Sequence, residues 1–165
     1  MNSSSTVTNV VLAGLGGQGV LKASDILADA ALRAGWDVKK SELHGMSQRG
    51  GSVSSDVRFG AEVLSPIVPV GEADFLLALA SDQVEPNRQC LRPGATLITP
   101  EEIDASRLQN RKSLNVALLG RLSQYLNIAD EHWLAAIRAH LPDKLHAANE
   151  QAFETGRTKP GPPVR

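Results

Sequence analysis

The stretch VTNVVLAGLGGQGV, residues 7–20, decides the fold of this chain. Its first half, Val7–Ala13, is rich in valine and has no polar residue after Asn9. Such a run is typical of a strand that is buried on both faces of a sheet. Its second half, Gly14–Gly19, matches the pattern G-x-G-x-x-G, in which glycines allow a tight turn from a strand into a helix.

A helix and a second strand are predicted directly after this turn. Apolar residues recur at helical spacing from Val20 to Ala34, and Gly35 is a typical helix stop. Trp36–Ser41 is then expected to form a strand. Together these elements predict one right-handed βαβ unit.

The remaining residues alternate between predicted strands and predicted helices. Further strands are expected at Ser52–Phe59, Glu62–Leu64, Ala73–Ala80 and Ala95–Thr99, with turns at Gly60-Ala61 and Pro93-Gly94. Helices are expected at Asn115–Leu126, from the N-cap Asp130 to just before Pro142, and at Asp143–Thr155, which Gly156 closes. The order predicts an α/β fold: a three-layer Rossmann-like open sheet, mostly parallel, with C-terminal helices.

Size and charge exclude several classes of protein. The 165 residues suit one domain, expected at 7–157 between a disordered start at 1–6 and a disordered tail at 158–165. The formal net charge of -1 argues against a nucleic-acid binder. No apolar run approaches the roughly 20 residues of a membrane-spanning helix, and residues 1–6 lack the features of a secretory signal. We therefore expect a cytoplasmic protein that binds neither nucleic acid nor membrane.

The single cysteine, Cys90, limits the redox chemistry that the chain can perform. One thiol cannot ligate an iron–sulfur cluster, which takes four ligands. Cys90 is expected to be an ordinary half-buried thiol. The sequence predicts no metal site and no catalytic residue, since no nucleophile is paired with a base.

The glycine turn has two functional interpretations and one purely structural one. Glycines and free N–H groups at a helix start favour an anion, so the turn could bind a dinucleotide phosphate or another anionic cofactor. Alternatively, the glycines permit a close strand–helix crossing and bind nothing. An acidic residue lies where a ribose-binding carboxylate is expected after the second strand. The candidate residues are Gly14, Gly16, Gly17, Gln18, Gly19 and Glu42.

The loop after the second predicted strand is rich in hydrogen-bond donors and glycine. It lies where open α/β sheets present their ligand crevice. Arg49 could hold a phosphate or carboxylate, or could simply be solvated in a polar turn. His44 is expected to be a hydrogen-bonding residue rather than a base. The candidate residues are Gly45, Met46, Ser47, Gln48, Arg49, Gly50 and Gly51.

Taken in order, these segments resemble the gamma-type domain of the pyruvate/2-oxoacid:ferredoxin oxidoreductases. The resemblance covers most of the chain, and the loop at 44–51 is similar to that of the beta subunit of indolepyruvate oxidoreductase. The segments that carry it are GLGGQGV (14–20), ELHGMSQRGG (42–51), SVSSDVRF (52–59), Ser65-Pro66, GEAD (71–74), LRPGATLI (91–98), NVALLG (115–120) and NEQAFETGR (149–157).

The resemblance implies a non-catalytic subunit of a complex that oxidatively decarboxylates an aryl 2-oxoacid to its acyl-CoA and reduces ferredoxin. Thiamine diphosphate, Mg and the 4Fe-4S clusters are then expected in an alpha-type partner subunit, and coenzyme A is a co-substrate. The two glycine-rich loops would contact the partner or the phosphates of coenzyme A.

Two features depart from the pattern that is usual in this family. The segment SDQVEP, residues 81–86, stands where an acidic residue and a helix-initiating Glu are usual. Thr99–Ser113 is shorter than in relatives and contains no predicted strand.

Two other functions fit the glycine turn. A stand-alone NAD(P)-dependent oxidoreductase would need affinity for the nicotinamide cofactor and a base in the crevice. A nucleotide-binding module would bind its ligand without a large partner. The sequence itself does not specify the 2-oxoacid or the stoichiometry of a complex.

Overall fold

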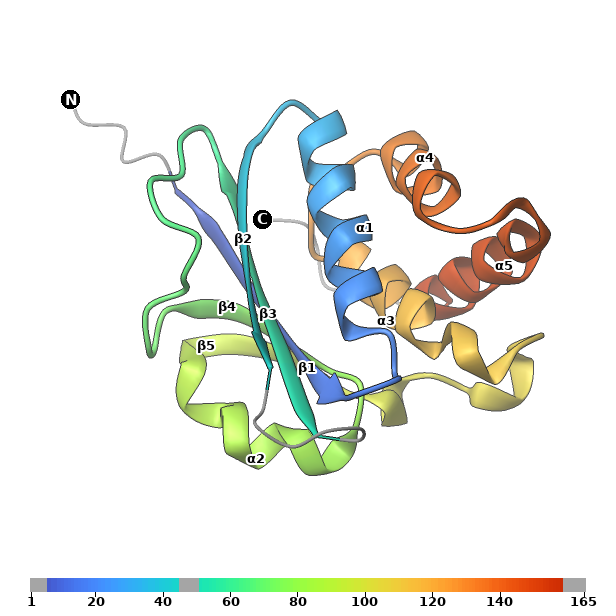
Figure 1. Ribbon diagram of the computed structural model, residues 1–165, viewed down its shortest axis with the longest axis horizontal. Coiled ribbons are helices and arrows are strands. Elements are labelled where there is room, and N and C mark those ends of the chain that lie inside the picture. Colours follow the sequence, from blue (N-terminus) through green and yellow to red (C-terminus); the bar gives the residue numbers. More distant parts are fainter. Residues whose placement is uncertain (1–5, 45–50, 159–165) are drawn as a thin grey trace.

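The computed structural model describes residues 6–44 and 51–158, which form a five-stranded sheet with helices packed mainly on one face (Figure 1). The strands are β1 (Thr8–Leu15), β2 (Asp37–His44), β3 (Ser52–Gly60), β4 (Ala73–Ala78) and β5 (Leu91–Ile98). The helices are α1 (Val20–Arg33), α2 (Val84–Asn87), α3 (Leu114–Ser123), α4 (Asp130–His140) and α5 (His146–Arg157).

The sheet is mixed, with the strand order β2-β3-β1-β4-β5. The pairs β1–β4 and β4–β5 are parallel, but β3 runs antiparallel to both of its neighbours, β1 and β2. The α/β class and the open sheet are confirmed. The prediction of a mostly parallel sheet holds only in part: β1, β2, β4 and β5 run in the same direction, but both pairings of β3 are antiparallel. The connection at 45–51 is too short for a parallel crossover, which needs a dozen or more residues, so β3 returns antiparallel.

The predicted βαβ unit is therefore split. Strands β1 and β2 run in the same direction, because each is antiparallel to β3, but β3 lies between them. The strand and the helix themselves are confirmed, and Gly35 follows the end of α1 with a φ of 94°.

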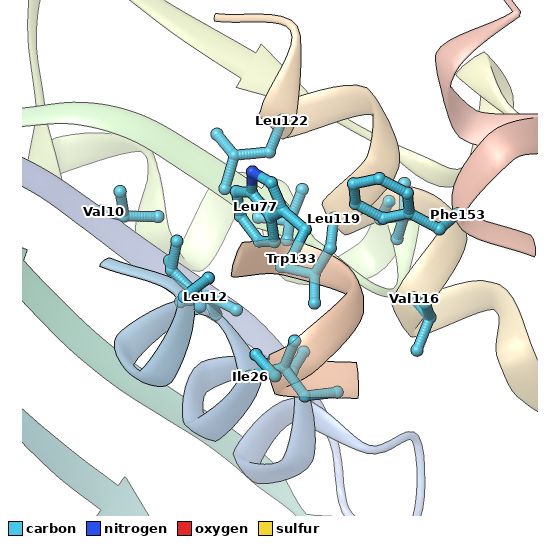
Figure 2. Close-up of a cluster of buried hydrophobic side chains, with 14 of the residues drawn as sticks. Val10, Leu12, Ile26, Leu77, Val116, Leu119, Leu122, Trp133 and Phe153 are labelled. Carbon is cyan, nitrogen blue, oxygen red and sulfur yellow. The ribbon is translucent and has the colours of Figure 1, made fainter. Parts of the chain in front are cut away.

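The larger hydrophobic core lies between the sheet and α1, α3, α4 and α5. Alternate residues of β1 face it, among them Val10 and Leu12, which Figure 2 shows beside the side chains of the helices. Trp133 of α4 and Phe153 of α5 are fully buried in it, with ring centroids 5.6 Å apart. Buried residues of α3, α4 and α5 thus meet in one core.

The opposite face of the sheet has a much smaller core. Val11 and Ala13 of β1 pack there with Leu76 of β4 and with Val68 from the connection between β3 and β4. The cover on this side consists of that connection and of the short helical stretch 81–90. The third layer is thus present but thin.

The short strand predicted at Glu62–Leu64 is absent, and residues 61–72 contain no strand. In this segment side-chain carboxylates, rather than a neighbouring strand, accept hydrogen bonds from the backbone. The N–H of Val63 donates to Asp37 over 2.8 Å, and the N–H of Val68 donates to Asp56 over 2.9 Å. These bonds satisfy the backbone without a ladder.

The turn predicted at Pro93-Gly94 is instead part of the edge strand β5. Pairing with β4 skips from Leu91 to Thr96, so the two residues occupy an irregularity in the ladder. Proline is tolerated here because an edge strand leaves one side of the backbone unpaired.

Two predicted helix signals are wrong. Ala129, not Asp130, is the N-cap of α4, and the Asp130 carboxylate lies 2.8 Å from Arg157 instead. Gly156 lies inside α5 rather than closing it. A Cβ at Gly156 would overlap the carbonyl oxygen of Ala117, so the glycine lets α5 pack closely on α3.

In the part of the chain that the structure describes, no helix has the length and apolar character needed to cross a membrane. The predicted disordered ends, 1–6 and 158–165, lie outside the described residues except for Thr6 and Thr158.

Candidate functional site: the glycine turn before α1

The turn between β1 and α1 is held by its own backbone and by Gln18. Gly17 and Gly19 adopt left-handed φ values of 88° and 83°. The side-chain carbonyl of Gln18 accepts a hydrogen bond of 2.7 Å from the N–H of Leu15, and the N–H of Gln18 donates to the carbonyl of Leu15 over 3.1 Å. Gln18 thus uses the carbonyl end of its side chain to close the turn.

Gly14 of β1 packs closely against Gln18 of the turn and Val20 of α1. A Cβ at this position would lie 2.7 Å from Val20 and 2.9 Å from the side-chain oxygen of Gln18. The glycine therefore serves the tight strand–helix crossing, which was one of the interpretations of the pattern.

Gly19 joins the turn to the start of α3. Its carbonyl accepts a hydrogen bond of 3.2 Å from the side-chain amide of Asn115, and a Cβ here would lie only 2.5 Å from that nitrogen. Gly19 is the N-cap of α1, and no described side chain caps the helix. The unsatisfied N–H groups and the dipole of a helix start favour an anion.

Two cavities flank the turn. One of about 400 Å³ is lined by Gly17, Gln18, Gly19, Leu79, Arg111, Lys112, Leu114 and Asn115. The other, of about 430 Å³, is lined by Leu15, Gly16, Gly17, Gly19, Val20, Leu21, Lys22 and Val53. Arg111, Lys112 and Lys22 are exposed and make no ion pair among the described residues. The combination of cationic and apolar walls suits an anionic ligand with an apolar portion.

The second candidate loop is only partly described. Gly51 contacts the glycine turn directly, because its carbonyl accepts a hydrogen bond of 2.9 Å from the N–H of Gly16. The structure therefore brings the end of this loop to the turn. The other candidates, Gly45, Met46, Ser47, Gln48, Arg49 and Gly50, lie outside the described residues.

Glu42 does not have the position of a ribose-binding carboxylate. It lies on β2, and β3 separates β2 from β1 and its turn. Its carboxylate pairs with Lys40 at 2.6 Å, and Lys40 also pairs with Asp25 of α1. Burial alone would lower the pKa of Lys40, but the hydrogen bonds to Asp25 and Glu42 outweigh it and raise that pKa. In the usual dinucleotide-binding fold β2 lies beside β1, which brings the carboxylate that follows β2 close to the glycine turn. Here β3 lies between the two strands, so Glu42 is not in that position.

Cys90 is an ordinary half-buried thiol, as predicted. Burial, and to a smaller extent the carboxylate of Asp56, raise the pKa of this thiol to about 11. The thiolate, which is the nucleophile and the metal ligand, is therefore disfavoured. Among residues 6–44 and 51–158, no group of three or more His, Cys, Asp or Glu side chains could hold a metal ion.

Arg111, Lys112 and Asn115 were missed as site residues in the sequence. The basic pair just before an apolar helix was a weak signal. Nothing in the local pattern indicates that the start of α3 lies against the start of α1, which is a property of the tertiary fold.

A family model and several known proteins match most of the chain. The family model described as pyruvate ferredoxin/flavodoxin oxidoreductase matches residues 9–159. The subunit IorB of indolepyruvate oxidoreductase from Archaeoglobus fulgidus is 54% identical over 187 residues, covering 90% of this chain and 92% of that protein. The subunit of the same name from Thermococcus kodakarensis is 35% identical over 188 residues, covering 90% and 93%. These alignments exceed the 165 residues of the chain, so the relatives contain residues that it lacks.

Solved structures share the fold. A 2-oxoglutarate:ferredoxin oxidoreductase from Magnetococcus marinus, solved with 2-oxoglutarate, coenzyme A and succinyl-CoA, has a TM-score of 0.81 at 22% identity, covering 96% of this chain and 32% of that one. The gamma subunit of a keto/oxoacid ferredoxin oxidoreductase from Geobacter sulfurreducens has a TM-score of 0.77 at 22% identity, covering 91% and 96%. Because the family model matches nearly the whole length of the chain, the chain belongs to the pyruvate ferredoxin/flavodoxin oxidoreductase family.

Proposed function

We propose that this chain is the non-catalytic subunit of an indolepyruvate:ferredoxin oxidoreductase. The observation that carries the proposal is the 54% identity, over 90% of the chain, to an indolepyruvate oxidoreductase subunit. The reaction converts an aryl 2-oxoacid and coenzyme A into the acyl-CoA, CO2 and a proton, and two electrons pass to two ferredoxins. The single cysteine cannot form a disulfide within the chain, so the fold does not need an oxidising compartment. We place the complex in the cytoplasm.

The redox groups belong to the partner in this proposal. A 4Fe-4S cluster takes four cysteine ligands, and this chain has one cysteine. The clusters are therefore assigned to an alpha-type subunit. We assign thiamine diphosphate and Mg to the same subunit, where thiamine diphosphate would supply the carbanion-stabilising chemistry.

The role that we propose for the glycine turn is to bind and orient coenzyme A. The start of α1 and the cations Arg111 and Lys112 would hold phosphate groups, while Leu79 and Leu114 line the same cavity with apolar surface. Correct orientation of the thiol relative to the partner's reactive centre lowers the barrier without acid–base chemistry from this chain.

The test is co-expression with the large thiamine- and cluster-bearing subunit, followed by assay of indolepyruvate oxidation with coenzyme A and ferredoxin. The complex should be active and the chain alone inactive. The double variant R111A/K112A should raise the KM for coenzyme A about tenfold with kcat unchanged, which corresponds to a loss of about 1.4 kcal/mol of binding. Lys144→Ala, at an exposed cation outside the cavity, is the control and should leave KM unchanged.

Other outcomes decide against parts of the proposal. An unchanged KM in the double variant would remove the coenzyme from this cavity but leave the subunit role intact. If the chain instead elutes alone, binds NAD(P)H and reduces a substrate, the subunit role fails and the stand-alone oxidoreductase is the better account.

A further inference from the structure

The connection between β3 and β4, residues 61–72, lies on the side of the sheet away from α1, α3, α4 and α5 (Figure 1). It exposes large aliphatic side chains. Leu64 is 87% exposed, Ile67 59% and Val70 81%. They account for half of the large hydrophobic residues that are exposed in the described part of the chain. No residue from 63 to 70 is charged. An exposed aliphatic cluster of this kind is typical of an interaction surface.

This connection is held in place by polar groups of the sheet beneath it. Every bond to the sheet involves the backbone of the connection, and the side chains of Leu64, Ile67 and Val70 remain exposed. The bonds are Val63 N–H to Asp37 (2.8 Å), Val68 N–H to Asp56 (2.9 Å), Arg58 to the carbonyl of Ser65 (2.9 Å) and Asn9 to the carbonyl of Glu72 (3.1 Å). Two prolines, Pro66 and Pro69, stiffen it further. A surface that is ordered in advance loses less entropy when a partner binds.

The charges at its ends favour one kind of partner. Glu62 and Glu72 are exposed at either end of the uncharged stretch, and neither makes an ion pair among residues 6–44 and 51–158. A second copy of this chain, seated on the same surface by a twofold axis, would bring four carboxylates to one interface, which is unfavourable. A different protein with Lys or Arg at the rim of an apolar groove would complement it.

We propose that Leu64, Ile67 and Val70 form the surface that docks into the large partner subunit, in an apolar groove edged by basic side chains. This inference rests on the proposed function, since it names the contact by which the subunit joins the complex. The aliphatic side chains supply the buried area, and Glu62 and Glu72 supply orientation and charge attraction.

The test uses the complex formed by co-expression and measures the dissociation constant of the two subunits. The double variant L64D/V70D should weaken association by at least about 100-fold, because two charges would be buried in an apolar groove. L32D is the matched control, since Leu32 is 61% exposed but lies on α1, on the other face of the sheet; it should bind like the wild type. E62K/E72K should weaken binding about tenfold at low salt and less at high salt.

Each outcome has one meaning. If the wild-type chain does not join the large subunit, the proposed function fails and this inference with it. If the wild type joins and L64D/V70D binds equally well, the docking surface lies elsewhere while the proposed function stands. If the chain alone is a dimer that L64D/V70D dissociates, the surface joins two copies and the inference is overturned. Circular dichroism and thermal unfolding of the uncomplexed variants show that the fold is retained, because both replaced side chains are exposed.

Discussion

At the scale of single residues, the glycine turn shows that similar backbone conformations can have different causes. Gly17 and Gly19 are both left-handed, with φ values of 88° and 83°. Nothing lies within 4 Å of a Cβ built at Gly17, whereas one built at Gly19 would lie 2.5 Å from the amide nitrogen of Asn115. At Gly17 the backbone alone requires glycine. At Gly19 the contact with α3 requires it as well.

This difference predicts unequal effects of alanine. Gly17→Ala should lower the free energy of unfolding by about 1–2 kcal/mol, the cost of the left-handed backbone. Gly19→Ala should lose a further ~1–3 kcal/mol, because Asn115 must move and its bond to the Gly19 carbonyl is weakened. Urea denaturation of both variants measures the difference. Equal losses would mean that α3 does not constrain the turn.

At the scale of elements, the segment that carries Arg111 and Lys112 depends on α3 and α5 for its position. It consists of three short 3-10 turns, Pro100–Glu102, Ala105–Arg107 and Arg111–Ser113. Arg121 of α3 is only 8% exposed and lies 3.5 Å from Glu102. Gln151 of α5 donates to the carbonyl of Arg107 over 2.7 Å. The short segment identified in the sequence is thus an ordered part of the fold.

Removal of the buried cation should therefore be costly. Arg121→Ala should lower the free energy of unfolding by about 3 kcal/mol, because Glu102 loses its partner and Tyr125 loses the guanidinium that lies 5.4 Å from its ring. Arg107→Ala removes an exposed arginine of the same segment and should cost less than about 1 kcal/mol. Chemical denaturation of both variants provides the comparison, and similar losses would contradict the role assigned to Arg121.

At the scale of the whole molecule, stability should be highest in the middle of the sheet. The six interior residues of β1 are buried, and β1 is paired on both sides, whereas β2 and β5 are each paired on one side only among the described residues. Backbone amides of β1 and β4 should therefore exchange with solvent more slowly than those of β2 and β5. Hydrogen exchange followed by mass spectrometry tests the order. Slower exchange in an edge strand than in β1 would show that the sheet does not open from its edges.

Local patterns in the sequence determined the elements near the glycine turn. The apolar run of β1, the helical spacing of α1 and the stop at Gly35 depend on neighbours along the chain, so the sequence alone predicts them. The resemblance carried by the two loops likewise predicted the family. These features need no knowledge of distant contacts.

Only the tertiary structure decided the order of the strands and the walls of the site. Insertion of β3 between β1 and β2 places Glu42 away from the turn, and packing of α3 on α1 brings Asn115 to Gly19. Gly156 looks like a helix stop in the sequence, yet it lies inside α5, where the close approach of α3 leaves no room for a Cβ. Such pairings join residues far apart in the chain, and their energies come from packing and hydrogen bonds that no local periodicity encodes.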